Sequence, residues 1–163
     1  SAHKWLLAPK GTGFLYVNRG AMDRIQPISL FSGPSAYSAS SGTRSVPSVI
    51  GLGASLDFFL KSGLDKVARH SMGLRAQLLD GLKRVSGIKV ASPLAGPLAS
   101  SMLSFSVNDK KTRSIAEALS EKSNIVVKVA SSPGFDGLRI SPHVYNDSKD
   151  IDKLLGSLRE LLA

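Results

Sequence analysis

The sequence predicts an α+β fold in which two helices precede a small sheet with helices packed against it. Apolar residues recur every three or four positions over residues 49–60 and 67–85, the period of an amphipathic helix. Several short β-branched runs follow, and a further helical segment separates them. The last segment of the chain has the apolar stripe of a helix, and an acidic capping residue precedes it. Helices and strands grouped in this order are typical of an α+β arrangement.

The first part of the chain combines one apolar run, one long polar stretch and one helical pattern. Residues 14–17, Phe-Leu-Tyr-Val, predict a short buried strand. Residues 32–47 are rich in serine, glycine and proline and have no period, which predicts a long loop. A loop of this length is uncommon in a compact domain unless it forms a site or reaches a partner. After Pro47 we expect a helix with a broad buried face that Gly63 ends.

The second part of the chain is more regular. The longest predicted helix starts at Leu64, keeps its apolar rhythm to Val85 and ends by Gly87. The last helix starts at an Asp147 cap, with Asp150 three positions later as in a capping box. Between these two helices we expect strands at 88–91, 102–107, 125–129 and 138–141 and a helix from about 112 to 121.

A change of composition near Gly63 predicts a domain boundary. The glycine-, serine- and proline-rich first part gives way there to regular helical and strand patterns. We therefore divide the chain into residues 1–62 and 63–163.

Composition excludes several classes of protein. Of the 163 residues, 42% are hydrophobic and 20% are charged, which is far from the composition of disordered chains. No apolar run reaches the ~18 residues of a membrane span, and no secretory leader is recognised. There is no cysteine, so these residues hold no disulfide, no thiolate zinc site and no cysteine nucleophile. We expect no metal and no membrane contact, and a cytoplasmic protein.

The charge is strongly basic but dispersed. Lysine and arginine total 21 against 12 acidic residues, which gives a net charge of +9. The densest group is Lys110, Lys111 and Arg113, and aromatic residues make up only 6% of the chain, so no stacking platform accompanies the charge. This pattern predicts no nucleic-acid binding and is compatible with anionic ligands.

Lys4 is the strongest candidate for a chemically reactive side chain. The sequence around it runs Ser-Ala-His-Lys-Trp and then, after an apolar stretch, Pro-Lys-Gly-Thr-Gly. One interpretation is a surface lysine beside a chain end. The other is a Schiff-base lysine that condenses with an aldehyde cofactor, with the hydroxyl of Ser1 and the imidazole of His3 as phosphate ligands. Gly11 and Gly13 would permit the tight turn that follows.

The run from Ser1 to Val17 closely resembles the lysine motif of class V aminotransferase-like enzymes, which are pyridoxal-phosphate proteins of fold type I. The Trp5-Leu6 pair and the Ala8-Pro9-Lys10 sequence look most like the isopenicillin N epimerase-like branch. The resemblance implies pyridoxal 5'-phosphate as cofactor, with Lys4 as the catalytic lysine. Ser1 and His3 are implied as further cofactor ligands.

Two further motifs carry the resemblance in the family's order. Gly42-Thr43-Arg44 lies in the long loop, and in the family its Gly-Thr pair reaches the cofactor phosphate of the other subunit. This implies cofactor contacts from Gly42 and Thr43 and a homodimer in which loop 32–47 crosses to the partner. Gly137-Leu138-Arg139-Ile140-Ser141, followed by His143, Tyr145 and Asn146, matches the segment whose arginine binds the substrate carboxylate. Arg139 is thereby implied to bind the amino-acid substrate.

Complete family members carry a larger portion ahead of the lysine motif, with the acid that pairs with the pyridine nitrogen and the ring-stacking residue. Neither is found in this sequence. We therefore expect a carboxy-terminal portion of an enzyme: the end of the large cofactor-binding domain over residues 1–62 and the small α+β domain over 63–163. Desulfurase chemistry needs a mobile cysteine thiol in this part, so the lack of cysteine disfavours it. Epimerisation, carbon-sulfur lysis and transamination remain alternatives.

Simpler roles stand beside each of these assignments. Thr43 could only stabilise its loop, and Arg139 could form an ion pair with Asp147 or Asp150. His70, His143 and Tyr145 receive no catalytic role. For the whole chain, the alternative is a non-enzymatic basic module that binds an anionic partner.

Overall fold

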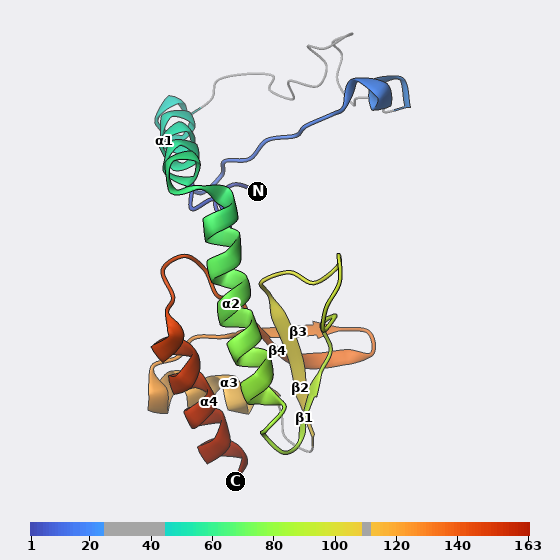
Figure 1. Cartoon of the computed structure of the whole chain (residues 1–163), viewed down its shortest axis with the longest axis vertical. Helices are drawn as coiled ribbons and strands as arrows, with labels where there is room; N and C mark the ends of the chain where they lie inside the picture. Colours follow the sequence, from blue (N-terminus) through green and yellow to red (C-terminus); the bar gives the residue numbers. More distant parts are fainter. Residues whose placement is uncertain (25–44, 109–111) are drawn as a thin grey trace. The chain divides into compact units, whose positions relative to one another are not determined.

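The computed structural model describes residues 1–24, 45–108 and 112–163. The chain divides into two compact units, Ser1–Gly63 and Leu64–Ala163. Figure 1 labels their α-helices and strands in chain order. In the described part of the chain, no helix is both long enough and apolar enough to cross a membrane.

The first unit is built on helix α1 (Val46–Ser62), which follows the short 3-10 helix η1 (Arg19–Arg24) in the chain order of described elements. Pro47 stands in the first turn of α1, where its missing N–H costs no hydrogen bond. Gly63 ends the helix with a φ of 83° and donates its N–H to the carbonyl of Phe59. The predicted helix and its glycine stop are thus both observed.

The burial of α1 differs from the prediction. Phe59 is the only buried residue of this helix, while Val49, Ile50 and Leu60 are exposed. The helix is apolar on more than one side, so its sequence pattern predicts more burial than the described part of this unit provides.

The strand predicted at residues 14–17 is wrong for the described structure. Phe14, Leu15 and Tyr16 are 67%, 71% and 78% exposed, and no strand is assigned there. Strand propensity measures how well a residue fits a paired, half-buried surface, and no described strand pairs with this run. The apolar pattern therefore predicted a strand that does not form in the described structure, because no other strand pairs with it.

The second unit consists of three helices and a four-stranded antiparallel sheet. Its helices are α2 (Leu64–Leu82), α3 (Thr112–Ser123) and α4 (Ser148–Leu162). Its strands are β1 (Ile88–Val90), β2 (Leu103–Val107), β3 (Lys128–Ser132) and β4 (Phe135–Ile140), in the order β1-β2-β4-β3. The α+β class predicted from the sequence is confirmed.

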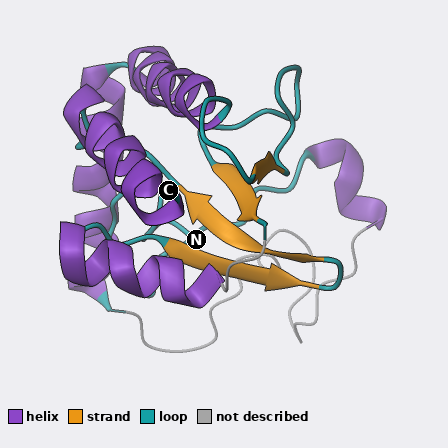
Figure 2. Cartoon of the chain, turned by 90° about the horizontal axis from the view of Figure 1, so that it is seen from below, coloured by secondary structure: helices purple, strands orange, loops and turns teal. Residues whose placement is uncertain are grey.

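The three helices of this unit cover one face of the sheet (Figure 2). Leu78, Leu119 and Leu158, from the three helices, are completely buried against Phe105 and Leu138 of the sheet. Alternate residues of β2 and β4 point to the other face, as the period of a strand requires. This second face carries the polar residues that form the candidate site.

Several boundaries differ from the prediction, and one of them is the start of β4 at Phe135, three residues before the predicted 138. Helix α2 ends at Leu82, and tight turns carry the chain through buried Val85 to Gly87, whose φ is 77°. Strand β3 starts three residues later than predicted, because Asn124 takes a φ of 51° and residues 124–127 link α3 to the strand. A Pro133-Gly134 turn then joins β3 to β4, and Gly134 has a φ of 79°.

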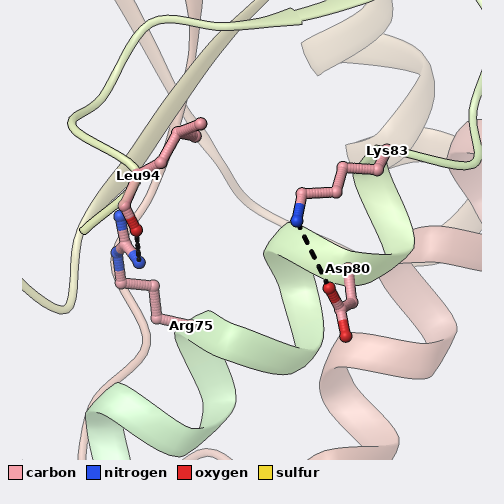
Figure 3. Close-up of polar contacts among 4 residues, drawn as sticks. All are labelled: Arg75, Asp80, Lys83 and Leu94. Atoms are coloured by element: carbon pink, nitrogen blue, oxygen red, sulfur yellow. Dashed lines mark hydrogen bonds and ion pairs between the residues drawn. The ribbon is translucent and has the colours of Figure 1, made fainter.

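A buried arginine ties α2 to the segment between β1 and β2 (Figure 3). Arg75 is only 4% exposed, and its guanidinium donates to the carbonyl oxygens of Pro93 and, at 3.4 Å, Leu94. At the carboxy-terminal end of this helix, exposed Asp80 forms an ion pair at 3.6 Å with Lys83, which directly follows the last helical residue. The buried cation therefore fixes a loop, whereas the surface pair contributes little to stability.

Candidate functional site: the lysine loop and the arginine face

Residues 2–8 form a closed loop that carries Lys4. The Ala8 N–H donates to the carbonyl of Ala2 at 3.1 Å, and the Ala2 N–H donates to that of Thr12 at 3.0 Å. Both alanines are buried. Within the loop, the Leu7 N–H donates to the carbonyl of Lys4 at 3.1 Å, and Leu7 has a φ of 55°. The backbone of Lys4 is thus held within a loop that hydrogen bonds close.

Helix α1 braces this loop through three residues spaced four apart, which lie on one helix face. Phe59 stacks on Trp5, with ring centroids 5.2 Å apart and planes inclined by 21°. The Ser55 hydroxyl donates to the carbonyl of Leu6. The third residue, Gly51, lies so close to Pro9 that an added Cβ would come within 2.6 Å of the ring. The loop is therefore held by aromatic, polar and close-packing contacts together.

The side chains of Ser1, His3 and Lys4 are exposed on this braced loop. Across the described ranges, neither a hydrogen bond nor an ion pair reaches the Lys4 ammonium. A hydroxyl, an imidazole and a primary amine on one short loop suit an anionic aldehyde, because the amine can condense with the aldehyde and the other two groups can bind phosphate. The residues present therefore fit one side of pyridoxal phosphate.

The hollow found in this unit lies elsewhere. It measures about 590 Å³ and is lined by Ser55 and by apolar residues around Pro9, Gly51 and Phe58. Neither Lys4 nor its neighbours Ser1 and His3 line it. Gly42, Thr43 and the loop 32–44 lie outside the described residues. Among the described residues of the first unit, Lys4 is therefore exposed and does not lie in this hollow.

Arg139 lies on the sheet face opposite the helices. Its neighbours Leu138 and Ile140 are buried in the core, whereas Arg139 is exposed and pairs in register with Ser104 and Lys128 on the two adjacent strands. It lines a pocket of about 260 Å³ at the start of α4. Arg139 and Lys4 belong to different units of the chain.

The acids that were candidate partners of Arg139 are engaged at the cap of α4. Asp147 accepts from the backbone N–H groups of Lys149 and Asp150 at 2.8 and 3.1 Å, and Asp150 accepts from the Asp147 N–H at 3.2 Å. This is the predicted capping box. In the described parts of the chain, neither acid forms an ion pair with Arg139.

The turn before α4 is held by Asn146. The His143 N–H donates to the Asn146 side-chain oxygen at 3.0 Å, and the Asn146 amide donates to Asp150 at 3.0 Å. That hydrogen bond and, after it, the one from the Asp147 N–H lower the pKa of Asp150 against the opposing effect of desolvation, and the charge of Lys153 adds to the lowering. His70 of α2 donates from Nε2 to the Asn146 carbonyl at 2.9 Å. His70, to which the sequence assigned no role, thus helps to position this turn.

Sequence analysis did not predict some of these features. The brace of Gly51, Ser55 and Phe59 shows a four-residue spacing, but only the folded loop identifies what it contacts. The pairing of Lys128 with Arg139 depended on the register of β3, whose start was predicted three residues too early.

Comparison with known proteins identifies the family. The profile described as Aminotransferase class-V matches residues 1–154, and the chain therefore belongs to the class V aminotransferase family. The matched range includes both the Lys4 loop and Arg139.

Individual relatives are distant and longer. The chain is 27% identical to a probable cysteine desulfurase of Methanothermobacter thermautotrophicus and 26% identical to an isopenicillin N epimerase of Amycolatopsis lactamdurans. These alignments cover 98% and 99% of this chain but only 46% of either relative. The apo structure of a cysteine desulfurase from Thermococcus onnurineus NA1 matches with a TM-score of 0.84 at 24% identity, over 99% of this chain and 46% of that one. The chain thus spans under half the length of these relatives, and it shares the fold of the matched part of the solved structure.

Proposed function

We propose that these residues form the carboxy-terminal portion of a pyridoxal-phosphate-dependent enzyme that acts on an amino acid, with Lys4 as its Schiff-base lysine. The observation that carries the proposal is the Lys4 loop, which fixes the backbone and leaves the amine exposed without a partner among the described residues. Membership of an enzyme family favours this function over a non-enzymatic module. The fraction of the relatives that the chain spans supports its assignment to a portion of a longer enzyme.

Each predicted residue has a role in this proposal. When bound, pyridoxal phosphate supplies an electron sink that stabilises negative charge at the substrate α-carbon. Lys4 holds and moves the proton at that carbon, and Ser1, His3, Gly42 and Thr43 bind the phosphate. Arg139 binds the substrate carboxylate through the two parallel hydrogen bonds that a guanidinium can donate.

The reaction is proposed to be epimerisation, carbon-sulfur lysis or transamination, since all three begin by removing that proton. The relatives include an isopenicillin N epimerase and several probable cysteine desulfurases. Desulfurase chemistry is disfavoured here because the 163 residues contain no cysteine. The epimerase-like branch that the Trp5-Leu6 and Ala8-Pro9-Lys10 motifs resemble is our preferred alternative.

We also propose a homodimer in which loop 32–47 brings Gly42 and Thr43 to the partner's cofactor. Thr43→Ala should then weaken cofactor retention more than it weakens folding. Equal losses of both, or a strictly monomeric active enzyme, would count against the crossing loop.

The proposal is tested by comparing two lysines of one loop region. In the intact enzyme, Lys4→Ala should abolish turnover of amino acids, whereas Lys10→Ala, a change of another exposed lysine, should leave it nearly unchanged. The isolated 163-residue chain with added pyridoxal phosphate should not turn over amino acids. Activity that survives Lys4→Ala, or turnover by the isolated chain, would refute the assignment.

A further inference from the structure

Three cations surround one hollow at the free edge of the sheet. The hollow measures about 720 Å³ and is lined by Lys128 of β3, Arg139 of β4 and Arg113 of α3, together with residues of β3 that include Ser131 and Ser132. Strand β3 is the last strand of the sheet order, so the hollow follows an edge. All three cationic residues are exposed.

Lys128 and Arg139 are direct register partners on adjacent antiparallel strands. Like charges placed opposite each other in this way destabilise a sheet, because their side chains share one face at short range. The Cα atoms of such partners lie about 4.5–5.5 Å apart, so the two long side chains can reach two groups of one small molecule. Repulsion between these two cations therefore destabilises the ligand-free sheet, and a ligand with more than one negative charge would relieve it.

No acidic residue offsets this charge at the hollow, as far as the described residues go. None of the described residues that line it is acidic. Asp136 pairs with Ser131 and so points to the other face from Lys128, and Glu117 lies one helical turn beyond Arg113. Within the described ranges, neither of these acids forms an ion pair with the three cations. By contrast, the smaller pocket, which Lys128 and Arg139 also line, includes Asp150.

We propose that Lys128, assisted by Arg113, forms an anion subsite beside Arg139 that selects amino acids with a negatively charged side chain. This inference rests on the proposed function, in which Arg139 binds the α-carboxylate. The side-chain carboxylate of the substrate then lies in the larger hollow, where it offsets part of the positive charge of Lys128 and Arg113.

The test uses two ligands that differ by one charge. L-glutamate and L-glutamine are titrated separately into the 163-residue chain without cofactor, and backbone amide shifts of residues 127–132 and 139 are followed by NMR. We expect L-glutamate to bind about fivefold more tightly, the ratio that corresponds to about 1 kcal/mol for one exposed ion pair. The preference should shrink as salt is added.

Lys89 provides the matched control. It is an exposed lysine on the opposite edge strand, β1, in register with Ser106. Lys128→Gln should bring the glutamate-to-glutamine ratio close to one, and Lys89→Gln should leave it unchanged. Equal binding of the two ligands, no binding of either, or equal effects of the two variants would overturn the subsite.

The failure of this inference can be told from that of the proposed function. The titration contains no cofactor and does not involve Lys4. If Lys4 proves dispensable while Lys128 still selects L-glutamate, the proposed enzyme role fails and the anion subsite stands. If Lys4 is essential and the ligand preference is missing, only the subsite fails.

Discussion

Gly137 tests the packing that places Arg139. A Cβ added at Gly137 would lie 2.3 Å from the carbonyl oxygen of Phe105 and 2.6 Å from the ring of Phe135, whereas ordinary contact starts at 3.4 Å. The nearest obstacle is backbone, so relief requires strands β2 and β4 to separate where Phe105 pairs with Leu138. Gly137→Ala should therefore destabilise the second unit.

The expected loss in the free energy of unfolding follows from two opposing effects of Gly137→Ala. Overpacking a well-packed core costs about 1–3 kcal/mol, and an obstacle made of backbone favours the upper part of that range. Replacing glycine by alanine in a strand returns about 0.5–1 kcal/mol. The expected net loss is about 2 kcal/mol, which lowers the urea midpoint by about 1–2 M for a unit of this size.

Urea unfolding of the whole chain measures this loss. Far-UV circular dichroism follows mainly the second unit, which holds three of the four α-helices found in the described residues, and fluorescence of the single tryptophan, Trp5, follows the first. Gly156→Ala is the control, because nothing lies within 4 Å of an added Cβ there and alanine favours the helix by about 1 kcal/mol. A Gly137→Ala chain as stable as the wild type would refute the packing argument.

Three further outcomes are expected. Arg139→Lys in the intact enzyme should weaken substrate binding by about 1–3 kcal/mol while the melting temperature barely moves, because lysine keeps the charge but loses the second hydrogen bond; a loss of stability with unchanged kinetics would make Arg139 structural. Because the pKa of Asp150 is lowered in the folded chain, its stabilising effect is complete above the ordinary value of 3.8 and is lost as the pH falls below it. The gap in urea midpoint between wild type and Asp150→Asn should therefore be smaller at pH 3 than at pH 7, and an equal gap would contradict this. Arg75→Met should speed hydrogen exchange in residues 93–102 at least about tenfold, since hydrogen bonds to a charged group contribute about 1.5–3 kcal/mol; exchange as fast in Lys83→Met would show that the carbonyl contacts of Arg75 are not the cause.

Local signals predicted much of the second unit. The Asp147 cap and the leucine stripe of α4 specify a helix by short-range contacts, and both are observed. Gly63 ends α1 because its positive φ suits glycine, which the sequence alone could indicate. Strand β3 was misplaced because Asn124 and the residues after it form a linker before pairing begins, and pairing depends on β4 rather than on local propensity.

The site was predicted less completely for the same reason. Lys4 and Arg139 were singled out through resemblance to a family, which the match over residues 1–154 supports. The contact of Trp5 with Phe59 and the register of Lys128 with Arg139 join residues 54 and 11 positions apart, so only the folded chain identifies them. The run at 14–17 shows the converse, because a local pattern without a pairing strand does not make a sheet.

Locating the cofactor on the chain tests the central claim most directly. The intact enzyme is loaded with pyridoxal phosphate and reduced with borohydride, and the modified peptide is mapped by mass spectrometry. The proposal predicts one dominant modified lysine, Lys4, with Lys10 unmodified and no dominant site in the Lys4→Ala variant. A cofactor trapped on Lys10 or on another lysine, with Lys4 unmodified, would contradict the assignment of Lys4 as the Schiff-base residue.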